Sequence, residues 1–209
     1  MTDRTISDVF IIESLMMEEE DFSNRYEGRR LAELLRLSGK NPKYFYFTSK
    51  NEIPHLMELF RLSKYRYLHI SCHASENAIN TTEDELTFPE FSSLCKNYLK
   101  LRRVFFSACS LGSPYFTDIL AGNNKGMQSL TAPAQPIDFD YAAAIWSALY
   151  VSLFNRNTRS MTSDEISKAL THICKLFPVD FYFGKYRSEI DNWQHLKIEN
   201  RTGKLIILN

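Results

Sequence analysis

Short apolar runs alternate with amphipathic segments along most of this chain. Runs rich in β-branched and aromatic residues predict six strands, at 8–15, 43–48, 65–73, 103–109, 128–132 and 179–183. Apolar residues at helical spacing predict intervening helices at 25–38, 51–62, 87–99, 113–122 and 140–155, with a further helix beginning at 163. This alternation favours a mainly parallel sheet with helices on both faces.

Turn and capping residues refine the pattern. Thr87 and Ser113 each stand before a helical segment with proline close behind, so we expect both to cap helices. The polar segment 75–87 predicts a surface loop or a short hairpin. Apolar runs within 196–208, separated by turn residues, predict a hairpin at the C-terminal end.

Composition fits one globular domain over residues 1–209, because 44% of the residues are apolar and 24% are charged. Lys+Arg and Asp+Glu number 25 each, so no net field attracts nucleic acid or an anionic membrane. The first apolar run is interrupted by Glu13, which argues against a signal peptide, and no run has transmembrane length. We therefore expect a cytoplasmic protein with reduced cysteines and neither nucleic-acid nor membrane partners.

Two predicted strands end in residues that carry chemistry, His73 and, 36 residues further on, Cys109. The carboxyl ends of parallel strands meet at one edge of a sheet, where ligands bind. A cysteine hydrolase needs a thiolate, a histidine and N–H donors for the oxyanion. The small residues around Cys109, with Gly112, would let a substrate backbone approach, and a helix beginning at Ser113 would lower the pKa of the thiol. Each residue alone is more often a packed core residue.

The blocks around these residues resemble a family. Leu68–Ala74 (LHISCHA) and Ser107–Gly112 (SACSLG) resemble the histidine and cysteine blocks of the caspase-like cysteine peptidases, which include caspases, metacaspases, legumains, separases, gingipains and CHAT domains. The His–Cys separation is shorter than the roughly 50 residues of caspases and is closer to the bacterial CHAT-like branch. Residues 140–150 are also similar to a CHAT segment, without its preceding tryptophan. The resemblance covers about residues 8–185.

The resemblance implies a three-layer α/β sandwich: a mainly parallel six-stranded sheet, helices on both faces and a C-terminal hairpin. It implies Cys109 as the nucleophile and His73 as the general acid/base, with no cofactor. The backbone N–H groups of Cys109 and Ala74 would form the oxyanion hole. Ala74 replaces the family's glycine, and a positive φ there would strain it. No metal site is expected, because the Cys and His pairs do not supply four zinc ligands.

Substrate preference is predicted from acidic loops. In the resembled family, loops after the first and fifth strands shape the pocket for the residue before the scissile bond. Here these loops contain Glu20, Asp21, Asp138 and Asp140. Because a carboxylate in the pocket would pair with Arg or Lys, we expect cleavage after a basic residue. The alternative is a solvated acidic run, with Asp140 simply capping the next helix.

The resemblance further implies a protein or peptide substrate and a regulated effector of bacterial antiviral defence or cell death. We expect a regulatory protein or a small nucleotide-type signal to order the loops at 75–87, 123–139 and 155–163. One alternative is a catalytically silent binding module on the same fold. Another is a TIR-like or flavodoxin-like signalling domain, which explains the sheet but not the pairing of His73 with Cys109.

Overall fold

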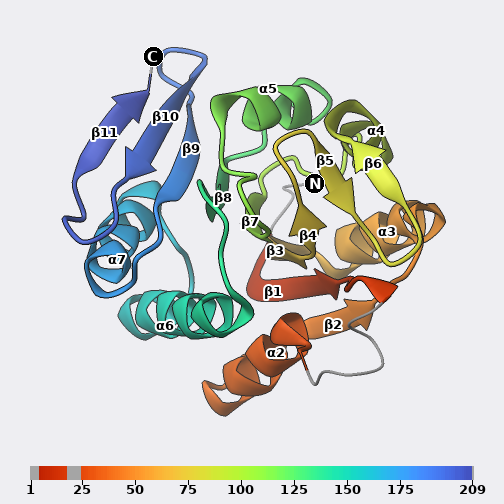
Figure 1. Ribbon diagram of the computed structural model, residues 1–209, viewed down its shortest axis with the longest axis horizontal. Coiled ribbons are helices and arrows are strands. Elements are labelled where there is room, and N and C mark those ends of the chain that lie inside the picture. The colour runs from red at the N-terminus through yellow and green to blue at the C-terminus, as the bar shows by residue number, and fades with distance from the viewer. Residues whose placement is uncertain (1–4, 18–24, 209) are drawn as a thin grey trace.

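The computed structural model describes residues 5–17 and 25–208 and is built on one eight-stranded sheet (Figure 1). Its strand order is β11-β10-β9-β8-β7-β3-β1-β2. The strands are β1 (Ile6–Glu13), β2 (Lys43–Tyr46), β3 (Tyr65–Ser71), β7 (Arg103–Ser107), β8 (Ser129–Pro133), β9 (Phe181–Arg187), β10 (Asn192–Ile198) and β11 (Leu205–Leu208). The six predicted strands are all present, within a few residues of the predicted bounds.

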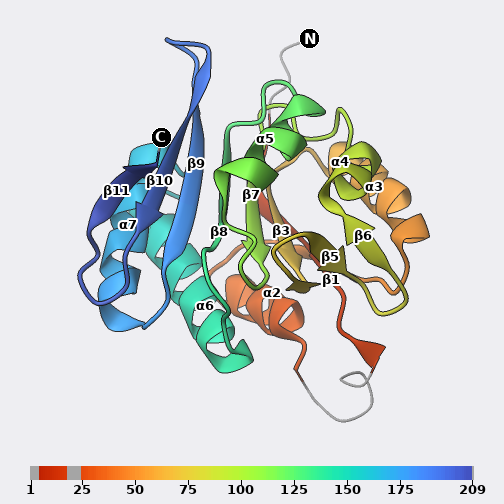
Figure 2. The same cartoon turned by 45° about the horizontal axis from the view of Figure 1, so that its top comes forward.

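The sheet is parallel on one side and antiparallel on the other. Strands β2, β1, β3, β7 and β8 pair in parallel, whereas β9, β10 and β11 continue the sheet in antiparallel fashion. The predicted C-terminal hairpin therefore exists, and it lengthens the sheet beyond β9 (Figure 2). The parallel part brings the carboxyl ends of β1, β3 and β7 to one edge.

Helices cover both faces of this sheet, as the sequence predicts. Helices α3 (Ile53–Ser63), α4 (Phe88–Leu94) and α5 (Pro114–Gly122) pack in one core. Helices α2 (Glu27–Leu37), α6 (Phe139–Arg156) and α7 (Ser163–Leu176) pack in the other, on the opposite side of the sheet in Figure 1. A short 3₁₀ turn, η1 (Lys50–Glu52), leads into α3. The three-layer α/β sandwich is confirmed.

Some predicted boundaries are wrong. The third strand ends at Ser71 and the fourth at Ser107, each two residues before its predicted end, and His73 starts a separate short strand. The helix that begins after Thr87 stops at Leu94 instead of 99, because Asn97 turns into a positive φ of 70°. There the N–H of Asn97 bonds the carbonyl of Asn123 instead of continuing the helix.

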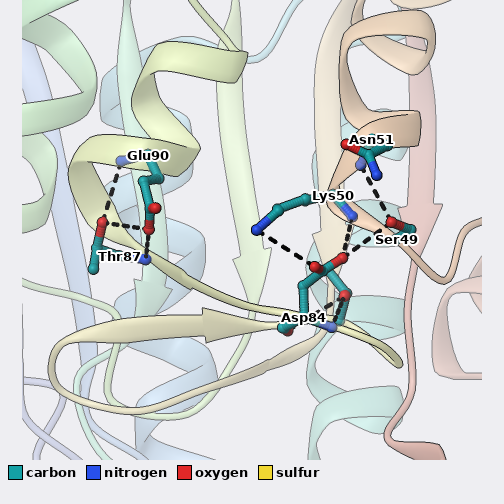
Figure 3. A network of polar contacts seen from close by, with 7 residues as sticks. Ser49, Lys50, Asn51, Asp84, Thr87 and Glu90 are labelled. Carbon is teal, nitrogen blue, oxygen red and sulfur yellow. Dashed lines mark hydrogen bonds and ion pairs between the residues drawn. The ribbon is translucent and has the colours of Figure 1, made fainter.

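The polar segment 75–87 is a hairpin, the second of the two predicted possibilities. Strands β4 (His73–Ala74), β5 (Ala78–Asn80) and β6 (Glu85–Thr87) form a small antiparallel sheet. Its turn is tied to η1 by Asp84, which accepts hydrogen bonds from the Ser49 hydroxyl (3.0 Å) and the Lys50 N–H (2.7 Å), as Figure 3 shows. At the other end Thr87 caps α4 with Glu90 in a capping box. The strand that starts with His73 is thereby fixed against the body of the protein.

No helix in the described part of the chain is both long enough and apolar enough to cross a membrane.

Candidate active site

His73 and Cys109 are delivered to one edge by neighbouring strands. Strands β3 and β7 pair in parallel up to Ser71 opposite Ser107, and the Cys72 N–H still bonds the Ser107 carbonyl (3.1 Å). His73 and Cys109 follow these ends directly. Both line a cavity of about 30 Å³ together with Leu15, Glu27, Ser71, Cys72, Ser107, Ala108, Ile137, Phe139 and Ala142. The structure thus brings the two predicted residues to one cavity at the carboxyl edge of the sheet.

Cys109 lies in a sharp turn that leaves the sheet. Ser110 adopts a positive φ of 54°, and its N–H bonds the Gln135 carbonyl (3.1 Å). Gly112 donates to the Pro133 carbonyl (2.8 Å), and a Cβ there would lie 2.6 Å from the Cβ of Tyr182. The glycine therefore serves the close packing of the turn against β8 and β9, whereas the sequence suggested that it clears a path for substrate. Ser113 caps α5, as predicted.

The two side chains are held by different neighbours. The thiol of Cys109 lies 3.6 Å from the Ile137 carbonyl oxygen, and the Ile137 N–H points back to its sulfur at 3.5 Å. The His73 ring packs edge-on against Phe139, with 5.4 Å between centroids. Within the described residues, the hydrogen bonds of the Cys109 thiol go to Ile137 and not to His73. Catalytic hydrogen bonds are often long before substrate binds, so this geometry is compatible with a dyad.

The predicted oxyanion-hole donors are the backbone N–H groups of Ala74 and Cys109. Ala74 lies opposite Ile79 in the pairing of β4 with β5. In the next pair along, the Ser75 N–H donates to the Ala78 carbonyl. Alternation along an antiparallel ladder then turns the Ala74 N–H away from β5. The Cys109 N–H has no hydrogen-bond partner within the residues that the structure describes. Ala74 lies in an extended strand, so the strain expected from replacing glycine is absent.

A buried carboxylate lies beneath the dyad and was missed by sequence reasoning. Glu27, the first residue of α2, is only 4% exposed and lines the cavity. Ser71 donates to its Oε2 (2.7 Å), and His69 Nε2 lies 3.7 Å from Oε1, an electrostatic contact too long for a hydrogen bond. Burial raises the pKa of Glu27, but the His69 imidazole and the Ser71 and Ser107 hydroxyls outweigh burial and lower it. A buried carboxylate, with His69 close to it, therefore lines the cavity.

A second buried carboxylate supports the first. Glu13, the last residue of β1, accepts hydrogen bonds from the N–H groups of Gly28 (2.7 Å) and Arg29 (3.2 Å) and from the Tyr44 hydroxyl (2.8 Å). It thus binds the N-terminus of α2, the helix that carries Glu27. Burial raises the pKa of Glu13 to about 7, against these hydrogen bonds.

A second thiol, that of Cys72, also lines the cavity. Cys72 packs in the apolar core, on the face of the sheet covered by α3, α4 and α5. Burial, with a smaller contribution from Cys109, raises the pKa of Cys72 to about 12. At neutral pH Cys72 is a protonated thiol and therefore a poor nucleophile.

The predicted substrate-binding residues are placed less favourably. Glu20 and Asp21 lie outside the described residues. Asp138 and Asp140 are both exposed, so neither is the buried carboxylate expected of them. Asp138, and not Asp140, occupies the N-cap position of α6, and it does so without a side-chain hydrogen bond. Asp140 borders a shallow pocket that it shares with Glu27.

No family model matches this sequence, and no curated protein matches it. Among solved structures, the crystal structure of the Arg specific cysteine proteinase gingipain R (RGPB) is similar, with a TM-score of 0.55 and 13% sequence identity. The match covers 99% of this chain and 61% of that chain. The chain therefore has a caspase-like fold. It spans less than two thirds of the length of that proteinase.

Proposed function

We propose that this protein is a caspase-like cysteine endopeptidase with a His73/Cys109 dyad. The observation that carries the proposal is that two neighbouring parallel strands deliver both residues to one cavity, in a fold shared with a cysteine proteinase. In this mechanism the Cys109 thiolate attacks the scissile carbonyl, and the N–H groups of Cys109 and Ala74 bind the oxyanion. His73 protonates the leaving amine, and water then hydrolyses the thioester.

We further propose cleavage after a basic residue, with Glu27 as the carboxylate that selects it. Glu27 is buried at the base of the cavity, and its Oε1 has no hydrogen-bond partner within the described residues. A substrate guanidinium or ammonium would meet this charge where little water screens it. The similar proteinase is itself described as Arg specific, which agrees with this preference. Asp138 and Asp140, being exposed, are left as outer contacts.

Activity of this kind needs regulation, and the small volume of the cavity supports an inactive resting state. A volume of about 30 Å³ holds about one water molecule, which is too little for an arginine side chain. The Cys109 thiol is also held by Ile137, which belongs to the 123–139 segment. We propose that a partner protein or a small nucleotide-type signal moves this segment, as in a cytoplasmic CHAT-like effector of antiviral defence or cell death. The hairpin at 75–87 is already tied to η1 through Asp84.

The decisive experiment combines covalent labelling with a substrate panel. Wild type, Cys109→Ala and Cys72→Ala are treated with peptidyl electrophiles carrying Arg, Lys, Asp or Ala next to the warhead, and labelled residues are mapped by mass spectrometry. We expect Arg and Lys probes to label Cys109 in wild type and in Cys72→Ala but to leave Cys109→Ala unlabelled.

Matching peptide substrates should lose at least about 10⁴-fold in turnover in Cys109→Ala. Labelling of Cys109 by Asp probes alone would overturn the specificity but keep the peptidase. Complete absence of labelling and turnover, with every candidate activator tried, would favour a catalytically silent module.

A further inference from the structure

The opposite edge of the sheet carries two arginines on the same two strands. Arg66 lies near the start of β3, and Arg103 is the first residue of β7, paired in register with Tyr67. Both line an open pocket of about 350 Å³, whose other lining residues are Thr5, Leu101, Gln128, Ser160, Met161 and Thr162. This pocket is separate from the dyad cavity, which lies at the carboxyl ends of the same strands.

Arg103 is a buried cation without a carboxylate partner. It is only 9% exposed, and its Nη1 donates to the hydroxyls of Ser129 (2.9 Å) and Ser163 (3.1 Å). Its Nε is buried and has no hydrogen-bond partner within the described residues. Burial, with a further contribution from Arg66, lowers the pKa of Arg103 to about 10, so it remains charged at neutral pH. Buried arginines are normally paired with an acid, so this one is unusual.

Arg66 is bound in the same way, by neutral oxygens. Its Nε donates to the Thr5 hydroxyl (2.7 Å) and its Nη1 to the Arg159 carbonyl (3.2 Å). In the described ranges 5–17 and 25–208, no carboxylate forms an ion pair with Arg66 or Arg103. Two like charges therefore share one pocket without a counter-ion from the described chain.

The start of helix α7 adds to the positive potential of the pocket. Thr162 caps this 14-residue helix and lines the pocket, so the positive end of the helix dipole lies there. Two acids lie in its first turn: Asp164 pairs with Lys185 (3.6 Å), and Glu165 attracts Arg103 at longer range. However, its carboxylate is engaged by the N–H (2.7 Å) and hydroxyl (2.8 Å) of Thr162 in the capping box. Glu165 thus stabilises the helix start and does not pair with either arginine.

We propose that this pocket binds a small anion that carries one or two phosphate groups. Guanidinium groups bind phosphate oxygens through paired hydrogen bonds, and the surrounding hydroxyls and the Gln128 side chain would complete the shell. An anion held between Arg66 and Arg103 would join β3 and β7 at the ends opposite His73 and Cys109. Binding is independent of the proposed peptidase activity, so either proposal can fail alone.

The test is calorimetric titration of the full chain with inorganic pyrophosphate and, in a second arm, with ATP, both at constant ionic strength. The variants are Arg66→Gln, Arg103→Gln and Arg103→Lys, with Arg156→Gln as a matched control because Arg156 is exposed near α7 but does not line the pocket. Circular dichroism and thermal melts establish that each variant is folded. Should Arg103→Gln not fold, Arg66→Gln and Arg103→Lys carry the test.

Saturable binding of at least one probe is expected, with affinity at least about tenfold lower in Arg66→Gln and Arg103→Gln and unchanged in Arg156→Gln. Tighter binding of ATP than of pyrophosphate would identify a nucleotide ligand, and equal binding would assign recognition to the phosphates alone. Absence of saturation by either probe up to about 10 mM, a concentration that corresponds to negligible affinity, would overturn the proposal. Equal affinity of wild type and both glutamine variants would overturn it as well.

Discussion

The two ends of the parallel strands, here called the carboxyl edge and the amino edge of the sheet, carry opposite charges. The hydrogen-bond partners of these charges differ. At the carboxyl edge, Glu13 and Glu27 are buried acids that accept hydrogen bonds from backbone N–H groups and hydroxyls. At the amino edge, Arg66 and Arg103 are cations whose hydrogen bonds within residues 5–17 and 25–208 go to neutral oxygens. Under the two proposals, the carboxyl edge receives a cation and the amino edge an anion.

This difference shows where the protein buries charged side chains despite the cost in free energy. A buried charge is costly unless it is paired, and proteins retain such charges mainly where they bind or react. Strand β7 begins with one such group, Arg103, and strands β3 and β7 lead at their other ends to His73 and Cys109. The same two strands therefore connect the proposed catalytic cavity with the proposed anion pocket.

Neutralising Glu27 should produce the largest change at the carboxyl edge. In Glu27→Gln we expect kcat/KM for peptides with Arg before the scissile bond to fall about 100-fold, because a buried charge pair with the substrate is lost. For peptides with Ala at that position kcat/KM should change less than about threefold, because the alanine side chain makes no ion pair with Glu27. Steady-state kinetics on the two peptides measure this directly.

The matched control for this variant is Asp140→Asn, which removes an exposed carboxylate from the neighbouring pocket. We expect it to leave the Arg-to-Ala preference unchanged. If Glu27→Gln keeps the wild-type preference and Asp140→Asn loses it, the specificity belongs to the exposed loop that the sequence indicated, and the contrast between the two edges loses its functional meaning.

The sequence predicts the sheet, its helices and the shared position of His73 and Cys109, because each depends on local pattern. Periodicity marks each element, and the parallel arrangement then brings strand ends such as His73 and Cys109 together. What the sequence does not reveal is which polar residues the packing buries. Glu27 did leave a signal, since it shares a helical face with Leu31 and Leu35 at spacings of four, and that face is buried against the sheet.

Other features depend on tertiary contacts that have no local signature. The shared pocket of Arg66 and Arg103 follows from the register of β3 against β7, which sets Arg103 opposite Tyr67 and which strand patterns do not specify. The short strand that begins with His73 depends on the hydrogen bonds by which Asp84 joins the 75–87 hairpin to η1. A β-strand pattern of two residues is too short to be read from sequence.

The contrast between the two edges can also be tested through pH, because folding changes the pKa of Glu13. Its pKa is raised to about 7 by burial, so folding favours the protonated acid. The stability that this gives is complete below the unfolded-state pKa and is lost as pH rises through 7. Between pH 5 and pH 8 we expect wild type to lose about 2 to 3 kcal/mol of unfolding free energy from this group.

Urea denaturation of wild type and Glu13→Gln at pH 5, 6, 7 and 8 isolates this contribution, because the other titrating groups cancel in the difference. The control is Glu33→Gln, which removes an exposed carboxylate from α2, the helix whose N-terminus Glu13 binds. Parallel stability curves for wild type and Glu13→Gln would mean that Glu13 is ionised throughout, and that both edges bury full charges.

The smallest effect is expected from Asp84, whose hydrogen bonds fix the hairpin beside the carboxyl edge. Asp84→Ala removes the acceptor for the Ser49 hydroxyl and the Lys50 N–H, and should cost about 1 kcal/mol of stability. Because β4 begins with His73, hydrogen exchange should quicken in β4 to β6 and remain unchanged in β3 and β7. Exchange that quickens across β3 and β7 as well would show that the hairpin and the sheet open as one unit. In that case a substitution at one edge of the sheet would also alter the packing at the other edge, and the two edges could not be tested separately.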